Sequence, residues 1–329
     1  MKSLNGVNLG GWLVLEKWMT PSVFKDTDAR NEFELSKTRQ GRERITAHHK
    51  SFITKKDLVW LKSCGVTILR VPVGHWIFGD DERYVGAIDR LDWLMDTSLL
   101  LGLQVLLDLH AAPGAQNRAA HSGSGNTVSN KYSIKWLNDS AKQAETIEIL
   151  ARLAERYRDF PNVWGIELLN EPAVDLTGVK LARFYRNAYR ALSKVARPGT
   201  RIVFSDGYAP FRLTNCFWLM TKREFPVVLD THVYQVFGKR NRSKTFERHI
   251  AQLRWTRRLL WFIRLQQPVI VGEWSAMLPA KTSPDETRAY VGAQQAAFDG
   301  TLAHFYWNYK TEAEGRWNYR DQAEKELLQ

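Results

Sequence analysis

Eight short apolar segments, separated by stretches with helical periodicity, constrain the fold of this chain more than any other feature of its sequence. Each segment is a nearly continuous apolar run, which is typical of a parallel strand that is buried on both faces. The eight segments are Gly6–Leu9, Thr67–Val71, Val105–Leu109, Val163–Leu169, Ile202–Ser205, Val227–Thr231, Val269–Val271 and Leu302–Tyr306. Alternation of such strands with helices predicts a parallel sheet. Eight units in 329 residues favour closure of that sheet into a (β/α)₈ TIM barrel.

The stretches between the apolar runs carry helix signals. Apolar residues recur on one face at helical spacing in 147–157 and in 181–195. A further helix is expected at Ser283, because Ser283 can cap it, Pro284 suits its first turn and Glu286 can complete a capping box. An open doubly wound sheet is the alternative fold, but no phosphate-binding glycine fingerprint follows the first apolar run.

Composition and chain organisation exclude several other classes of protein. Two cysteines, Cys64 and Cys216, are too few for a disulfide framework and lack zinc-site spacing, so no metal or other cofactor is expected. No stretch approaches the roughly 20 apolar residues of a membrane span, and no signal peptide is evident. The chain is therefore expected to be cytoplasmic as written, or secreted if a leader was removed. Without repeats or linkers, residues 1–329 are expected to form one domain that acts as a monomer.

The net charge of +12 is concentrated in one segment. Residues 239–264 contain nine Lys or Arg and one acidic residue, Glu247, which gives 9 − 1 = +8. Such a segment can be the solvated face of a helix, which is the favoured interpretation. It can also dock on an anionic membrane or polymer. Nucleic acid is not an expected partner.

Polar residues stand where most of the apolar runs end, which is where barrel enzymes carry their chemistry. In chain order they are Arg70 and His75, Asp108 and His110, Asn170 and Glu171, Asp206, His232 and Tyr234, Glu273, and Trp307. In a closed barrel the ends of strands four and seven face each other, so Glu171 and Glu273 are expected to form a facing pair. Two carboxyl groups across one bond are what glycosidic cleavage requires. A separation of about 5 Å implies retention of configuration and a wider gap implies inversion, which the sequence leaves open.

Six ordered motifs spread over nearly the whole chain resemble glycoside hydrolase family 5, and within it the exo-β-1,3-glucanase branch. They are Gly6–Glu16 (GVNLGGWLVLE), Arg70–Val73, Asp108–Asn117, Asn170–Pro172, His232–Tyr234 and Gly272–Ser275. This resemblance implies a retaining β-glycosidase, with Glu171 as the acid/base and Glu273 as the nucleophile, acting on β-1,3-linked glucan or oligosaccharides. The alternatives are another β-glucoside, such as a β-1,6- or β-1,4-glucan or a glycolipid, and a carbohydrate-binding protein without activity.

The resemblance also implies supporting roles. Arg70 and Tyr234 are expected to keep Glu273 ionised, while burial and the charge of Glu273 raise the pKa of Glu171. Asn170 is expected to bond the sugar 2-hydroxyl. The other expected site residues are the hydroxyl binders or supports Glu16, His110 and His232, and the sugar platform Trp307. The roles of His75, Asp108 and Asp206 are left open between site and scaffold.

The chain departs from the branch on the side of the leaving sugar. After Asn117 the branch continues with an aromatic residue and an Asp-Asn-Ser-Gly turn, whereas this chain has 118–123 (RAAHSG). If that aromatic residue clamps the leaving sugar against a partner that corresponds to Phe237, half of the clamp is missing. The segment 275–283 is also shorter than the corresponding loop of the secreted fungal enzymes. Acceptor preference and exo action are therefore not implied as firmly as the chemistry.

Overall fold

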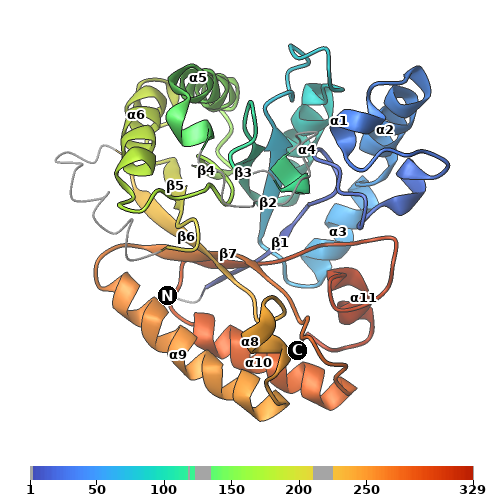
Figure 1. The fold of residues 1–329 in the computed structure, drawn as a ribbon, viewed down its shortest axis with the longest axis vertical. Coiled ribbons are helices and arrows are strands. Elements are labelled where there is room, and N and C mark those ends of the chain that lie inside the picture. Colours follow the sequence, from blue (N-terminus) through green and yellow to red (C-terminus); the bar gives the residue numbers. More distant parts are fainter. Residues whose placement is uncertain (1–2, 118, 123–134, 210–224, 329) are drawn as a thin grey trace.

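The computed structural model describes residues 3–117, 119–122, 135–209 and 225–328, and in these residues eight parallel strands form a closed barrel (Figure 1). The strands pair in chain order, and β8 pairs with β1 to close the ring. Their bounds are β1 Leu4–Asn8, β2 Ile68–Gly74, β3 Gln104–Ala111, β4 Val163–Glu167, β5 Arg201–Ser205, β6 Val227–Val233, β7 Val269–Trp274 and β8 Ala303–Tyr306. The prediction of a (β/α)₈ barrel is confirmed, and the open sheet is excluded.

Helices surround the barrel in Figure 1. Those of the described residues are α1 Glu32–Leu35, α2 Arg39–Ser51, α3 Lys55–Ser63, α4 Ile88–Leu101, α5 Ser140–Arg156, α6 Val179–Val195, α8 Lys239–Arg242, α9 Phe246–Arg264, α10 Pro284–Phe298 and α11 Tyr319–Glu324, with short 3₁₀ turns at Pro21–Phe24, Ala120–Ser122 and Trp136–Asn138. Both predicted helical stretches lie in α5 and α6. Helix α10 begins with the predicted capping box, in which Ser283 and Glu286 each accept the other's backbone N–H.

The barrel interior changes from apolar to polar along the strands. One apolar layer is formed by Ile68, Leu106, Trp164, Val203, Val228, Ile270, Ala303 and Phe305, which together come from seven of the eight strands. Because side chains two positions apart lie on the same face of a strand, Asp108 and His110 follow Leu106 into the interior on β3. On β2, Arg70 follows Ile68 in the same way. The strand geometry therefore places a polar layer directly above an apolar floor.

Two expectations from composition can be followed in the structure. Cys64 is a free thiol that is partly buried, and burial raises its pKa above the usual value. Cys216 lies outside the described residues. Among the helices that the structure describes, none combines the length and the apolar character needed to cross a bilayer.

Candidate active site

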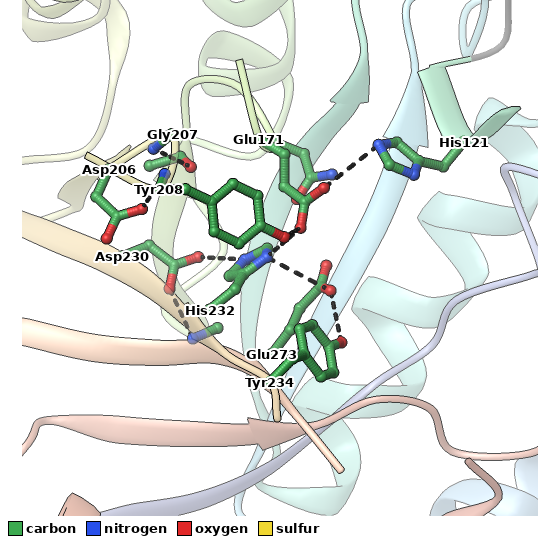
Figure 2. Close-up of polar contacts among 12 residues, drawn as sticks. His121, Glu171, Asp206, Gly207, Tyr208, Asp230, His232, Tyr234 and Glu273 are labelled. Carbon is green, nitrogen blue, oxygen red and sulfur yellow. Dashed lines mark hydrogen bonds and ion pairs between the residues drawn. The ribbon is translucent and has the colours of Figure 1, made fainter. Parts of the chain in front are cut away.

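The side chains of Glu171 and Glu273 meet at the carboxyl ends of the strands (Figure 2). Glu171 follows β4, and Glu273 belongs to β7. An oxygen of one carboxyl group lies within 4.8 Å of an oxygen of the other. The side chain of Glu171 is 14% exposed and that of Glu273 is 6% exposed. Two nearly desolvated carboxyl groups at this spacing can act together on a single bond.

His232 on β6 lies between the two carboxyl groups. Its Nδ1 is 2.7 Å from Glu171 Oε1 and 3.4 Å from Glu273 Oε2, and its Nε2 is 3.3 Å from Asp230 Oδ2. Burial opposes a charge on this ring, but the carboxylates of Glu273 and Asp230 hold the pKa of His232 well above its usual value. The raised pKa favours the protonated ring, which donates a hydrogen bond from each ring nitrogen.

Asp230 is fixed in turn by the next strand. The backbone N–H of Gly272 donates to Asp230 Oδ1 at 2.6 Å. A Cβ atom at position 272 would lie 2.0 Å from Asp230 Oδ2, so a side chain there would push the carboxylate away. The glycine of the Gly272–Ser275 motif thus allows Asp230 to reach His232, and this explains in physical terms why the motif begins with glycine.

Arg70 is fully buried and serves more groups than Glu273 alone. Its Nε and Nη2 donate to the two oxygens of Glu167 at 2.8 and 3.0 Å, a bidentate ion pair. Its Nη1 donates to Glu273 Oε1 at the longer distance of 3.2 Å, and its Nη2 lies 3.1 Å from Asp108 Oδ2. Burial opposes the guanidinium charge, but Asp108, Glu167 and Glu273 raise the pKa of Arg70 well above the usual value.

The order of the two carboxyl pKa values is the reverse of the expected one. Burial and the charge of Glu171 raise the pKa of Glu273 to about 7, against the opposing charges of His232 and Arg70. Burial also raises the pKa of Glu171, but the hydrogen bond and charge of His232, the charge of His121 and the Tyr208 hydroxyl lower it below the usual range. This order differs from the expected one because Arg70 is shared with Glu167, while the His232 ring lies closest to Glu171.

His110, Asn170 and Trp307 form a second group beside the pair. Asn170 Oδ1 accepts a hydrogen bond from Arg70 Nη2 at 2.8 Å, and its Nδ2 lies 3.4 Å from His110 Nε2. His110 is anchored through Nδ1, which is 2.7 Å from Asp108 Oδ2. The rings of His110 and Trp307 stack 5.5 Å apart with an interplanar angle of 8°. Side chains from β3 and from the segments after β4 and β8 thus lie in contact.

An aromatic group lies on the other side of Glu273. The Tyr234 hydroxyl donates to Glu273 Oε2 at 2.8 Å, and its ring contacts Phe237 with centroids 5.5 Å apart. Phe237 is 57% exposed and stacks on Trp317 at 6.1 Å. Trp18 meets the far side of Trp317 edge-on at 5.8 Å. The sequence did not indicate that Trp18 and Trp317 belong to this aromatic group, because neither residue directly follows an apolar strand.

The remaining candidates divide between the site and its scaffold. Buried Glu16 accepts a hydrogen bond from Trp18 Nε1 at 2.9 Å, and burial raises its pKa to about 7. Asp206 accepts from the backbone N–H of Tyr208 at 2.7 Å and so shapes the turn after β5. His75 is not brought to the two glutamates: its Nε2 lies 3.1 Å from Asp81 Oδ2, and its ring packs against Trp76 and Tyr84.

Two further residues contact Glu171 and were not predicted. The Tyr208 hydroxyl donates to Glu171 Oε1, the oxygen that also accepts from His232. Tyr208 has a φ of 61° and Glu171 a φ of 40°, a left-handed region that is unfavourable for such side chains. His121 Nε2 lies 3.6 Å from Glu171 Oε2, and it belongs to the segment that departs from the family pattern. Arg118 and residues 123–134 lie outside the described residues.

Among the described residues, two sets of side chains have a spacing that could hold a metal ion: Glu167, Asp230 and His232, and Glu171, His232 and Glu273. Positive charge already faces both sets. Arg70 lies 2.8 Å from Glu167 and 4.0 Å from Asp230, and the raised pKa of His232 favours a positive charge on its ring. A divalent cation would therefore meet like charge, and we interpret these residues as an ion-pair network around the carboxyl pair.

The sequence of the chain is similar to those of known glycoside hydrolases. Residues 28–313 match the family model described as Cellulase (glycosyl hydrolase family 5). The chain is 32% identical to the probable glucan 1,3-beta-glucosidase A of Aspergillus niger, over 94% of this chain and 83% of that protein. It is also 31% identical to glucan 1,3-beta-glucosidase 1 of Schizosaccharomyces pombe, over 77% of this chain and 63% of that protein.

Solved structures share the architecture at lower sequence identity. A rutinosidase from Aspergillus niger superposes with a TM-score of 0.83 at 20% identity, covering 100% of this chain and 98% of that one. Endo-glycoceramidase II from Rhodococcus sp. superposes with a TM-score of 0.61 at 15% identity, covering 96% of this chain and 74% of that one. At these identities the likeness concerns the fold.

Proposed function

Since the chain belongs to glycosyl hydrolase family 5, we propose that it hydrolyses β-1,3-glucosidic bonds with retention of configuration at the anomeric carbon. Family membership makes it a glycoside hydrolase. The observation that carries the proposal is the contact between Glu171 and Glu273, whose nearest oxygens lie within 4.8 Å. Retaining enzymes hold their carboxyl groups about 5 to 5.5 Å apart, whereas inverting enzymes need about 6.5 to 9.5 Å to admit a water molecule.

In the first step, a carboxylate oxygen of Glu273 forms a bond to the anomeric carbon while the bond from that carbon to the departing oxygen breaks. Arg70 and Tyr234 donate one hydrogen bond to each oxygen of Glu273 and orient the carboxylate for attack. Glu171 transfers a proton to the departing oxygen. The product of this step is a glucosyl ester of Glu273.

The proton for this step is held by His232 in the unliganded site. Its Nδ1 is 2.7 Å from Glu171 Oε1, so a proton can pass along this hydrogen bond and convert Glu171 into the acid. The negative charge of Glu273 contributes most to the raised pKa of His232. That charge disappears as Glu273 forms its ester, so the proton is released at the moment when the departing oxygen needs it.

In the second step, the Glu171 carboxylate takes a proton from water, and the water oxygen attacks the anomeric carbon. The ester bond breaks, Glu273 regains its charge, and the sugar leaves in the β configuration with which it began. The returning charge of Glu273 again favours a proton on His232, which restores the starting state.

The substrate assignment is supported by the relatives. Proteins named glucan 1,3-beta-glucosidase share about a third of their residues with this chain over most of its length. The acceptor side has its own character, because His121, from the segment that departs from the family pattern, lies 3.6 Å from Glu171. Because the acceptor side differs, hydrolysis of another β-glucoside is a second candidate function. A binding protein without activity would not require two desolvated carboxyl groups in contact.

Purified protein is expected to release glucose or short oligomers from laminari-oligosaccharides. Proton NMR of the first product should show the β anomer, because two successive inversions restore the configuration. Parallel digests of β-1,4- and β-1,6-linked disaccharides test the second candidate. Initial release of the α anomer contradicts the retaining mechanism, and cleavage restricted to the other linkages contradicts the β-1,3 assignment.

Replacing Tyr208 with Phe is expected to move the alkaline limb of the kcat/KM pH profile upward, by up to about one pH unit. The Tyr208 hydroxyl stabilises the ionised form of Glu171, so its loss makes Glu171 bind the proton that it shares with His232 more tightly, and the pair loses this proton at higher pH. Tyr157→Phe is the matched control, because Tyr157 donates a similar hydrogen bond to Asp92 Oδ1, on helix α4. Identical profiles for Tyr208→Phe and wild type would refute this role.

A further inference from the structure

Helix α9 lies at the outer edge of the molecule, beside α10 (Figure 1). The side that faces the barrel is formed by buried His249, Leu253, Leu260 and Ile263. These residues recur at helical spacing, so the positions between them point outward. None of the expected site residues lies on α9, and its outward face is free of the catalytic machinery described above.

The outward face carries large apolar side chains. Trp255 is 68% exposed, Trp261 58%, Phe262 45% and Leu265, which follows the helix directly, 64%. Burying such side chains stabilises a protein, so they are normally turned inward on a helix that packs on a core. Their grouping on one surface element is typical of an interaction site rather than of single exposed residues.

Arginine residues are interleaved with these side chains. Arg254, Arg257 and Arg258 are exposed, and the Arg258 guanidinium lies 5.0 Å from the centre of the Trp255 ring. No cation of 239–264 lies within ion-pair distance of an acidic group in the part of the chain that the structure describes. Some arginines on other helices are paired, as Arg156 is with Asp92 at 2.5 Å. The charge of +8 in this segment is thus left uncompensated at the surface.

We propose that the outward face of α9 docks on an anionic lipid surface, with Trp255, Trp261 and Leu265 inserted between headgroups and the arginines bound to lipid phosphates. A helix that combines a basic character with protruding Trp and Leu side chains has the properties of an interfacial helix. An anionic polysaccharide would satisfy the arginines and could stack on a Trp ring, but it would leave Leu265 in water. The apolar side chains therefore favour a lipid surface over a polymer.

Docking in this orientation leaves the site accessible. The glutamate pair lies at the carboxyl ends of the strands, whereas α9 runs along the outer wall between β6 and β7. The outward face of α9 is separate from the site, and binding to lipid does not depend on the proposed substrate. The enzyme is therefore expected to work at a membrane that it binds from one side.

Sedimentation with lipid vesicles tests the proposal on the full chain. Vesicles of phosphatidylcholine with a minor share of phosphatidylglycerol should bind the protein, vesicles of phosphatidylcholine alone should bind it at least about tenfold more weakly, and high salt should weaken binding. Each replacement Arg254→Gln or Arg258→Gln should lower the binding constant by about fivefold. The pair Trp255→Ala and Trp261→Ala should lower it at least about tenfold.

The pair Leu100→Ala and Leu176→Ala is the matched control, because these side chains are 81% and 83% exposed away from α9. Circular dichroism and hydrolysis of a soluble substrate should be unchanged in all of these variants. Three results would overturn the proposal: no binding by the wild type, equal losses in the control pair, or losses confined to the arginine variants. Retention on alginate without binding to vesicles would show that a polymer is the partner instead.

Discussion

Replacing Glu273 with alanine is expected to lower kcat for laminari-oligosaccharide hydrolysis by at least about four orders of magnitude. The variant lacks the oxygen that attacks the anomeric carbon, and the neighbouring Tyr234 does not replace it, because burial holds the pKa of its hydroxyl well above the usual value. Sugar binding should persist, because the other contacts of the site remain. Initial rates and calorimetric titration with an oligosaccharide measure the two effects separately.

Azide distinguishes the role of Glu273 from that of Glu171. In Glu273→Ala, azide can enter from the face that the carboxylate has left and should form an α-glucosyl azide from an activated β-glucoside. In Glu171→Ala the glucosyl ester still forms when the leaving group needs no acid, and azide attack on that ester should give the β-glucosyl azide. Both variants giving the same anomer would contradict the assignment.

Glu148→Ala is the control for both replacements, because Glu148 is exposed on α5. Its kinetics should match those of the wild type with and without azide. Wild-type turnover by Glu273→Ala would remove Glu273 as the nucleophile while leaving the fold and the family membership intact.

Replacing Arg70 with methionine is expected to destabilise the protein by at least about 3 to 5 kcal/mol, the usual cost of breaking a buried ion pair from one side. The variant would leave Asp108, Glu167 and Glu273 facing one another without a shared counter-charge. Lysine should restore part of the loss, because it keeps the charge but cannot make the bidentate contact with Glu167. Urea denaturation followed by circular dichroism measures the free energy of unfolding.

The matched control for Arg70 is Arg39→Met, which breaks an exposed pair with Glu43 on α2 and should change the free energy of unfolding little. If the Arg70→Met variant unfolds at the same urea concentration as the wild type, the buried acids are neutral when Arg70 is absent. The polar layer would then have to be described as a hydrogen-bonded network rather than as an ionic one.

The strands were predictable because strands buried on both faces leave long apolar runs that do not depend on distant contacts. All eight were located, although β2 continues to Gly74 and β6 to Val233, beyond the apolar stretch. The added residues include Pro72, Gly74 and His232, and hydrophobicity alone does not extend a strand through such residues. The helix that starts after Ser283 was predictable because a capping box is a local interaction.

The charge distribution at the site could not be predicted, because it depends on distances between side chains that are far apart in the sequence. The order of residues does not indicate that Glu167 accepts two hydrogen bonds from Arg70. It also does not indicate that the His232 ring turns its Nδ1 toward Glu171. Tyr208 was missed for another reason: it lies two residues beyond the strand-end residue Asp206, where no motif marks it. The one indication that Tyr208 belongs to the site was its position shortly after the end of a strand.

Arg70 joins side chains from most of the circumference of the barrel, from Asn8 at the start to Glu273 near the end of the ring. The contacts of Arg70 are therefore complete only after β7 has joined the barrel, because β7 carries Glu273. Glu171 follows β4 and Glu273 belongs to β7, so an incompletely assembled barrel has no aligned pair of acids, and hydrolysis is expected only from the closed barrel.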